Sequence, residues 1–448
     1  MAARDVVMRL QRAGHQAYFV GGFVRDWLLG IEHYDVDIAT SATPPEIIGL
    51  FEETREVGVH FGVVLVRHQG VTHEVATFRR DGEYIDFRRP REVHYGTLEE
   101  DAARRDFTIN ALYYDPLAGV LKDFHAGALD LRRRVLRTVG PAVKRFEEDA
   151  LRLLRAVRFA VRYELEIEPR TRRALQLKAP NLAQISRERI GEELLRILTG
   201  PRPGVAMRLM SALGLWAVTI PEVEELRGCE QGNEAHPEGD VFEHTARALD
   251  ALPPDPDPAL ALGALLHDIA KPRTFKREAE RITFAAHQTL GAEMARAICR
   301  RLRLSNELTD QVADLVHYHM RFMDVRRMRE ANLRRLLARP DFQLHLELHR
   351  ADSLASHGDL DAYEYCLEKR RELLVEHGEA LEPPPLASGR DLIALGHRPG
   401  PDFRRWLDAL REAQLEGRIR TREEALAFLR REAGPPIAEP AEAPDAPP

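Results

Sequence analysis

Two aspartates near the N-terminus have the spacing of a metal-binding strand. Asp35 and Asp37 lie in the segment YDVDIAT, and alternate residues of a β-strand project from the same side. Two carboxylates placed in this way can hold a pair of magnesium ions, which activate an attacking hydroxyl group and stabilise a leaving pyrophosphate. Glu74, in VTHEVATF, is the candidate third acid on a neighbouring strand. An Asp-x-Asp pair is weak evidence by itself, because most such pairs lie in solvated turns.

A glycine pair upstream of these acids could receive a triphosphate. Gly21 and Gly22 end the segment QAYFVGG, and the helical pattern FVRDWLLG follows. Backbone N–H groups at a strand-to-helix junction can approach phosphates, and the helix N-terminus favours negative charge. Arg25 lies one turn into this helix and can reach the same phosphates. The alternative is a tight turn with Arg25 and Asp26 as surface charges, which the glycines alone favour.

A basic helix is expected after Phe146. Apolar residues recur there with helical spacing, and an arginine follows each of them, at positions 152, 155, 158 and 162. Residues 131–173 contain 13 Lys and Arg against 6 Asp and Glu, although the whole chain has a net charge of −7. Such a stripe suits a polyphosphate partner, because counterion release drives the association; the alternative is a solvated helix face. Asp149 and Arg152 are three residues apart, so we expect them to share a helix face.

A second set of residues has the composition of a metal site. Adjacent His and Asp near the end of an apolar helix, with a distant His and Asp, can ligate a divalent cation, and two further histidines allow a second one. Such a site would activate water for attack on a phosphoester. The candidate ligands are His244, His267, Asp268, His287, His317 and Asp352. His319 is the alternative to His317, because residues two apart on a helix cannot both face one site.

These candidates must be positioned by two kinds of structure. Residues 1–140 show a mixed pattern of short strands and helices, and from about Val143 the pattern is helical with few strand candidates. The Pro-rich segments 252–259 and 381–389 indicate breaks between helices, and the Pro/Ala-rich end of the chain has a disordered composition. The expected fold class is therefore an α/β domain followed by all-α domains.

Four ordered motifs of the first 200 residues resemble one family. GGFVRDWLLG followed by YDVDIAT, then VGVHFGVVLV, RRDFTINA (104–111) and FEEDALRLLRAVRFA (146–160) are similar to the motifs of class II tRNA nucleotidyltransferases. This family comprises CCA-adding enzymes and bacterial poly(A) polymerases. The resemblance implies a nucleotidyltransferase head at 1–140, a helical RNA-binding neck at 141–227, an HD domain at 228–375, a helical tail at 376–432 and a disordered end at 433–448.

The resemblance also implies roles for individual residues. Asp35 and Asp37 would bind Mg²⁺ with Glu74 as a further catalytic acid, and Asp149 with Arg152 would select the incoming base through its Watson–Crick edge. Cytosine and adenine can satisfy an acceptor–donor pair that guanine and uracil cannot. The remaining nucleotide-binding residues would be Gly21, Gly22, Arg25, Arg105, Asp106, Arg155 and Arg158.

The expected reaction is addition or repair of the 3′-terminal CCA of tRNA from CTP and ATP. The segment 81–101 resembles the loop associated with the switch from C to A addition, which disfavours a CC-only enzyme. Full CCA addition and A-only addition remain open. The alternatives are a bacterial poly(A) polymerase, an HD phosphohydrolase with an RNA-binding N-terminal half, and a non-catalytic tRNA-binding scaffold.

The histidine and aspartate set resembles the HD phosphohydrolase superfamily, and Lys271 in HDIAKP fits the same pattern. The resemblance implies a divalent transition metal or Mg²⁺ there, and hydrolysis of phosphomonoesters or 2′,3′-cyclic phosphates if the domain is active.

Composition limits the class and the location. The 448 residues are 44% hydrophobic and 31% charged, and no apolar run approaches the length of a membrane span. The N-terminus is charged where a secretory signal would be apolar, so we expect a cytoplasmic protein with no membrane partner. Cys229, Cys299 and Cys366 have no metal-type or redox-type spacing and are expected to be reduced. The sequence does not predict the oligomeric state.

Overall fold

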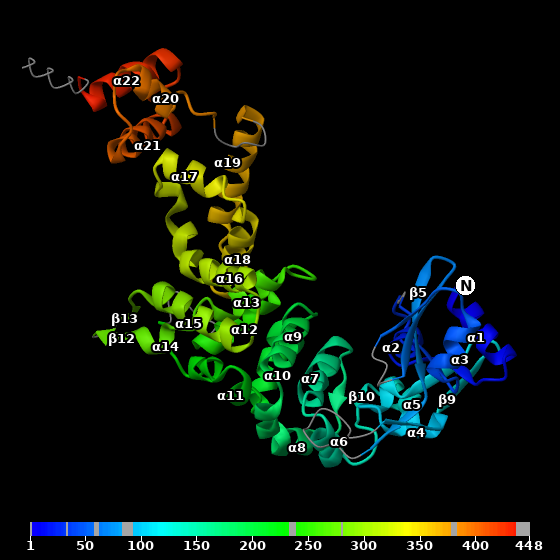
Figure 1. The fold of residues 1–448 in the computed structure, drawn as a ribbon. Coiled ribbons are helices and arrows are strands. Elements are labelled where there is room, and N and C mark those ends of the chain that lie inside the picture. The colour runs from blue at the N-terminus through cyan, green and yellow to red at the C-terminus, as the bar shows by residue number, and fades with distance from the viewer. Residues whose placement is uncertain are drawn as a thin grey trace, which may run out of the picture. The chain divides into compact units, whose positions relative to one another are not determined.

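A computed structural model describes residues 2–32, 35–57, 62–82, 93–232, 239–278, 281–377 and 383–435 (Figure 1). The chain divides into two compact units, Met1–His317 and Tyr318–Pro448, which are described separately below. Residues 83–92 of the loop at 81–101, residues 58–61 of VGVHFGVVLV and the end of the chain lie outside the described residues.

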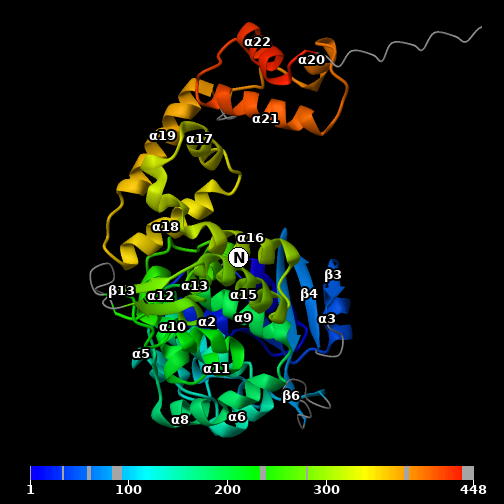
Figure 2. The same ribbon diagram turned by 90° about the vertical axis from the view of Figure 1, so that its left-hand side faces the viewer.

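The N-terminal sheet has seven strands in the order β3-β4-β5-β2-β1-β8-β9. The β2 and β5 strands are parallel, whereas the other neighbours are antiparallel. Helices α1 (Ala2–Arg12) and α3 (Pro44–Leu50) pack against this sheet, and Figure 2 shows α3 beside β3 and β4. The strands are β1 (Ala17–Val20), β2 (Ile38–Thr40), β3 (Thr54–Glu56), β4 (Val63–His68), β5 (Val71–Thr77), β8 (Leu112–Asp115) and β9 (Val120–Asp123).

Burial alternates along the strands as their sequences predict. In β5 the side chains of His73, Val75 and Thr77 are buried, while Glu74 is exposed. One face of the sheet is therefore covered by helices and the other is left for polar residues. The rest of this region consists of α2 (Gly22–Leu28), β6 (Arg79–Asp81), β7 (Val93–Tyr95), α4 (Leu98–Ala103), η2 (Thr108–Asn110), α5 (Gly127–Arg132) and β10 (Val135–Leu136).

Helices dominate from residue 142 onward, as the sequence predicts. The first of them differs from expectation, because the basic helix is broken in two. Asp149 has an extended backbone (φ −144°, ψ 104°), and its carboxylate accepts a hydrogen bond from the Leu151 N–H at 3.0 Å. This local bond from the backbone to the side chain competes with continuous helical bonding and lies at the break between the two helices. The elements are α6 (Ala142–Glu148), α7 (Arg152–Arg162), β11 (Glu166–Ile167), α8 (Pro169–Lys178), η3 (Ala179–Gln184), α9 (Arg187–Leu198), α10 (Pro203–Ala212), α11 (Trp216–Thr219) and η4 (Pro221–Leu226).

The last part of the first unit is also helical. The Pro/Asp-rich segment separates α12 (Val241–Asp250) from α13 (Pro258–Leu266), as predicted, and α13 is buried along its whole length. A hairpin that the sequence analysis did not predict, β12 (Phe275–Glu278) and β13 (Arg281–Phe284), lies between them and the later helices. The remaining helices are α14 (Lys271–Thr274), α15 (His287–Arg301) and α16 (Asn306–Tyr318).

The second unit contains two apolar cores among its described residues. One includes Phe322, Leu337 and Phe342, and the other includes Leu392, Leu410 and Leu429. Its elements are η5 (His319–Arg327), α17 (Glu330–Leu337), α18 (Phe342–Ala355), α19 (Asp361–His377), α20 (Gly389–Ala394), α21 (Pro401–Leu415) and α22 (Arg422–Ala433).

The mixed α/β region followed by helices confirms the predicted fold class. All three cysteines are buried and free, as expected. Among the described residues, none of the helices has the length and apolar character needed to cross a membrane.

Candidate nucleotide site and candidate metal cluster

The acidic pair lies just before strand β2 rather than within it. The assigned strand begins at Ile38, although the Val20 N–H still donates to the Asp37 carbonyl at 3.0 Å. Asp35 is exposed and Asp37 half-buried. Ile38 pairs with Val75 in the parallel ladder, so continuing the register by one residue sets Asp37 beside Glu74.

Glu74 lies between the buried His73 and Val75, so it belongs to the polar face of the sheet, and the register sets Asp37 on the same face. Carboxylate oxygens are the donors that Mg²⁺ prefers, so the residue types fit this ion. Within the described part of the chain, the ligand atoms of Asp35, Asp37 and Glu74 do not all lie within 4.8 Å of one another.

Arg25 is buried rather than a surface charge, which makes the ordinary-turn alternative wrong for this residue. Its side chain is 6% exposed, and its Nε donates to Asp26 at 2.7 Å. Its terminal nitrogens donate to the Asn110 side chain and to the Tyr163 hydroxyl, both at 2.5 Å. Gly21, with φ of 66°, lies against another arginine: a β-carbon there would be 3.2 Å from the Arg105 Nη1. The backbone conformation and the close approach both require glycine at this position.

Arg105 is held by a second buried network. Its guanidinium donates to the Tyr113 hydroxyl at 2.9 Å, to the Asn110 carbonyl at 3.3 Å and to Asp101 at 3.2 Å. Burial alone would raise the pKa of Asp101, but Arg105, Arg104 and the Tyr113 hydroxyl lower it to about 2. Arg105 is thus fixed with its Nη1 beside Gly21, at the start of α2.

The basic stripe of α7 is largely neutralised by acids from other elements. Arg155 donates twice to Asp106, at 2.9 and 2.6 Å, and Arg158 donates to the buried Glu193 at 2.6 Å. Although burial opposes it, Arg155 holds the pKa of Asp106 well below its usual range. The expected basic face therefore exists as ion pairs, and Asp106 contacts Arg155 across the head–neck junction.

Asp149 and Arg152 do not share a helix face, so that expectation is wrong. Asp149 precedes the helix that Arg152 begins, and each has a different partner. The Asp149 carboxylate accepts from Arg189 at 3.0 Å. Arg152 donates to Glu148 at 3.0 Å and to the carbonyl of Arg145 at 3.2 Å. A third bond, at 3.1 Å, goes to the Arg104 carbonyl. Two of the five Arg152 N–H groups have no partner among the described residues.

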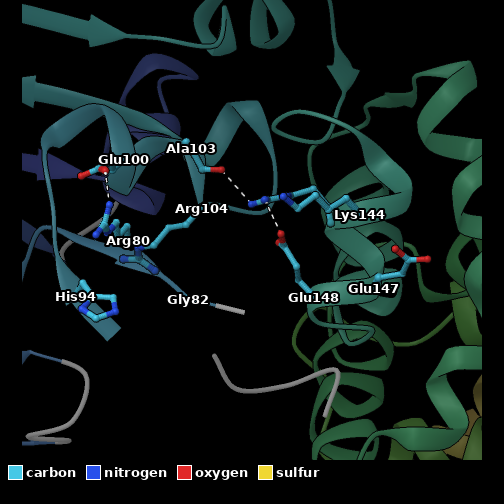
Figure 3. A pocket seen from close by; sticks show the side chains of 10 residues that line it. Arg80, Gly82, His94, Glu100, Ala103, Arg104, Lys144, Glu147 and Glu148 are labelled. Atoms are coloured by element: carbon cyan, nitrogen blue, oxygen red, sulfur yellow. Dashed lines mark hydrogen bonds and ion pairs between the residues drawn. The ribbon is translucent and has the colours of Figure 1, made fainter. Parts of the chain in front are cut away.

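A cavity of about 860 Å³ lies between the β6–β7 ribbon, α4 and α6 (Figure 3). Arg80 pairs with Glu100 on the head side at 3.6 Å. On the neck side, Arg145 pairs with Glu148 at 2.6 Å and donates to the Ala103 carbonyl. The cavity does not include the acidic strand. Its wall supplies the groups that hold Arg152.

The second cluster gathers four of the predicted ligands in the first unit. His267 lies 3.2 Å from both His244 and Asp268, measured between side-chain N and O atoms, and His287 lies 3.5 Å from Asp268. All four side chains are nearly fully buried. Burial lowers the pKa of His287 and favours the neutral imidazole, which is the form that binds metals. Three imidazoles and a carboxylate fit a divalent transition metal or Mg²⁺.

Lys271 is also part of this cluster. Its ammonium lies 2.7 Å from Asp268 and 2.6 Å from the Gln231 side chain. Burial alone would raise the pKa of Asp268, but Lys271 and His267 hold it well below its usual range.

The remaining predicted ligands stay predictions. His317 is half-buried at the end of the first unit, whereas His319, in the second unit, is buried. Asp352 is half-buried on α18 of the second unit.

Sequence reasoning missed the residues that hold the predicted ones. Asn110, Glu148 and Tyr163 contact the predicted arginines, and Arg189 contacts Asp149. Glu148 could have been found, because it lies three residues beyond Arg145 and four before Arg152. Arg189 is forty residues from Asp149, and its sequence neighbourhood gives no signal.

The fold and the two clusters define a nucleotidyltransferase-type head joined to a helical neck and an HD domain. Family models agree: residues 17–137 match the poly A polymerase head domain, 164–226 a probable RNA and SrmB-binding site of polymerase A, and 240–356 the HD domain. The curated CCA-adding enzyme of Geobacillus stearothermophilus is 46% identical over 214 residues, which cover 48% of this chain and 53% of the enzyme. That of Levilactobacillus brevis is 46% identical over 215 residues, 54% of its length. The chain thus matches about half the length of these curated relatives.

Solved structures match along nearly the whole chain. The Bacillus stearothermophilus CCA-adding enzyme in complex with CTP is 30% identical, with a TM-score of 0.72, and the match covers 96% of this chain and 97% of that one. The Thermotoga maritima CCA-adding enzyme complexed with tRNA shares the fold, at 21% identity and a TM-score of 0.60, over 96% of this chain and 94% of that one. The chain belongs to the CCA-adding enzyme family.

Proposed function

We propose that the chain adds or repairs the 3′-terminal CCA of tRNA, or its terminal A, from CTP and ATP. The observation that carries this proposal is the head–neck junction. There, arginines from α2, the segment after α4 and α7 are linked through Asn110 and Asp106, and the two base-reading candidates are fixed by separate partners. A similar chain, 30% identical along its length, binds CTP.

The proposed reaction is attack of the tRNA 3′ hydroxyl oxygen on the α-phosphorus of the nucleotide. A new phosphoester bond forms, the bond to the β-phosphate oxygen breaks, and pyrophosphate leaves. Asp35, Asp37 and Glu74 would hold Mg²⁺, which supplies stabilisation of the developing charge when bound. Arg25 and Arg105 would hold the triphosphate over the Gly21–Gly22 turn. Arg155 and Arg158 would hold the nucleotide from the neck through the N–H groups that their ion pairs do not use.

Base selection would follow from hydrogen-bond direction. Asp149 can still accept from an exocyclic amino group, because a carboxylate has about four lone-pair sites and two are in use. The unpaired N–H groups of Arg152 can donate to the adjacent ring nitrogen. Cytosine and adenine present this amino–acceptor pattern, whereas guanine and uracil present the reverse and would leave buried polar groups unpaired.

The test uses tRNAs that end before CCA, after C and after CC, each with one nucleotide at a time. We expect CTP to extend the first two and ATP the third, with GTP and UTP inactive. Extension of only the third substrate would assign A-only addition. Addition of many adenylates to any RNA would replace the proposal with a poly(A) polymerase, and no extension would refute it.

We propose a metal-dependent phosphohydrolase activity as a second function of the HD domain. The observation that favours it is the buried cluster of His244, His267, Asp268 and His287. Each of these side chains has a nitrogen or oxygen atom 3.2–3.7 Å from such an atom of at least one other member. Hydrolysis of a phosphomonoester and of a 2′,3′-cyclic phosphate, measured with and without added divalent metal, tests it. A cytoplasmic location and the bounds of the five expected domains remain predictions.

A further inference from the structure

Tyr163, the residue that follows α7, is the only aromatic hydroxyl hydrogen-bonded to Arg25 among the residues that the structure describes. Its hydroxyl accepts from the Arg25 Nη2 at 2.5 Å and is hydrogen-bonded in turn to Asp26. Its ring lies under the same guanidinium, with the Arg25 Cζ 4.3 Å from the ring centroid. Tyr163 is 4% exposed, so the contact is dry. Arg25 comes from the head and Tyr163 from the neck, 138 residues later.

The guanidinium is fixed on three sides. Asp26 binds the Nε, Asn110 binds one terminal nitrogen and Tyr163 binds the other, while the Tyr163 and Phe159 rings cover the face. Phe159 and Tyr163 are four residues apart on one side of α7 and stack with centroids 6.2 Å apart. Three of the five Arg25 N–H groups are occupied in this way. The other two belong to the terminal nitrogens, which are the pair that can grip a phosphate group in a bidentate manner.

We propose that Tyr163 is a positioning residue that orients Arg25 toward the β- and γ-phosphates of the incoming nucleotide. The inference rests on the proposed function. Tyr163 would not touch the substrate. Its hydroxyl selects the orientation of the guanidinium in which two N–H groups remain available, and its ring supports that orientation through a cation–π contact. The neck would thereby take part in triphosphate binding through a head residue.

The test measures equilibrium binding of CTP and of CMP without tRNA, together with KM and kcat for tRNA extension. Tyr163→Phe keeps the ring and removes the hydroxyl. We expect CTP affinity to fall about 10-fold, the loss of one charge-assisted hydrogen bond. CMP lacks the β- and γ-phosphates, so its affinity should change less than about 2-fold. KM should rise for CTP and ATP by the same factor, with little change in kcat.

Two further variants make the result decisive. Tyr363→Phe removes a hydroxyl that hydrogen-bonds to Glu347 in the second unit, and should change neither affinity. In an Arg25→Gln background, adding Tyr163→Phe should have no further effect on CTP binding, because the group that Tyr163 orients is gone. Equal losses for CTP and CMP, unchanged CTP affinity in a folded Tyr163→Phe protein, or a full additional loss in the Arg25→Gln background would each overturn the proposal. A wild-type chain that binds CTP but does not extend tRNA would instead refute the proposed reaction.

Discussion

The head–neck junction and the HD cluster use buried charge in opposite ways. In the junction, buried arginines pair with acids that come from distant elements, as with Arg155 and Asp106 or Arg158 and Glu193. In the HD cluster, a carboxylate and three imidazoles surround a common space, and one ammonium, Lys271, pairs with Asp268.

The difference shows what each region is suited to bind. A cluster of arginines that keeps unused N–H groups is suited to a polyanion, because each guanidinium can bind phosphate while its other donors keep it in place. A cluster of neutral imidazoles around a carboxylate is suited to a cation. Because the two sites share no residues, substitutions can disable each of them separately.

The largest expected effect is on nucleotide addition. Asp35→Ala or Asp37→Ala should lower tRNA extension by at least about 1,000-fold, because metal-ion stabilisation of transferred charge contributes several kcal/mol. Folding and tRNA binding should be largely retained, since Asp35 is exposed and Asp37 half-buried. Rapid-quench extension assays beside a binding assay measure this. Extension at the wild-type rate by either variant would remove these acids from the mechanism.

The reciprocal change tests the HD cluster. His267→Ala or Asp268→Ala should eliminate metal-dependent phosphohydrolase activity and leave tRNA extension within about 2-fold. Asp268→Ala should also lower stability by about 3–5 kcal/mol, because it leaves the Lys271 ammonium buried without its partner. Both activities are measured on the same preparations. Parallel loss of extension in folded His267→Ala protein would show that the two sites are not independent.

A smaller effect is expected on base choice. Arg152→Ala should reduce discrimination against GTP and UTP by roughly 10- to 150-fold, the equivalent of one charge-assisted hydrogen bond of about 1.5–3 kcal/mol. The measurement is kcat/KM for all four nucleotides with a melting curve. A uniform loss for every nucleotide would mean that Arg152 only supports the junction through Glu148 and the Arg104 and Arg145 carbonyls.

Arg189→Gln should also reduce base preference, but by less than Arg152→Ala. Arg189 orients the Asp149 carboxylate from α9 at 3.0 Å and is not expected to touch the base. We expect about a 3- to 10-fold loss of preference for CTP and ATP over the other nucleotides, the scale of one hydrogen bond. Arg196→Gln, a mostly exposed arginine on the same helix, is the matched control. Equal behaviour of the two variants would contradict the positioning role of Arg189.

The last expected effect concerns stability in acid rather than activity. The pKa of Asp101 is about 2 in the fold, against about 3.9 for an unfolded aspartate, so its contribution is present above about pH 4 and is lost as pH falls toward 2. The contribution is about 2 kcal/mol. Asp101→Asn should be less stable than wild type at pH 5, and the difference between their urea midpoints should shrink between pH 4 and pH 2. A difference that does not change with pH would contradict this assignment.

The sequence by itself determined the residue types and the order of the motifs. Asp35, Asp37, Gly21 and Arg25 are recognisable because chemistry and backbone conformation restrict what can stand there, and these constraints act over a few residues. The strands of the first 140 residues and the apolar helix that ends at Leu266, directly before His267, follow from local periodicity in the same way. A pattern that extends over only a few residues identifies candidate groups and the helices or strands that carry them.

Only the tertiary structure decided how those groups are held. Asp149 lies outside the helix, where its carboxylate accepts from the Leu151 N–H and pairs with Arg189. The basic stripe is neutralised by Asp106 and Glu193 from other elements. The Arg25–Tyr163 contact joins residues 138 positions apart. A buried charge must find a partner wherever the fold brings one, and the partner's distance along the chain is unconstrained. Local sequence therefore shows which charges exist, while the packing of head against neck determines which of them remain available for a ligand.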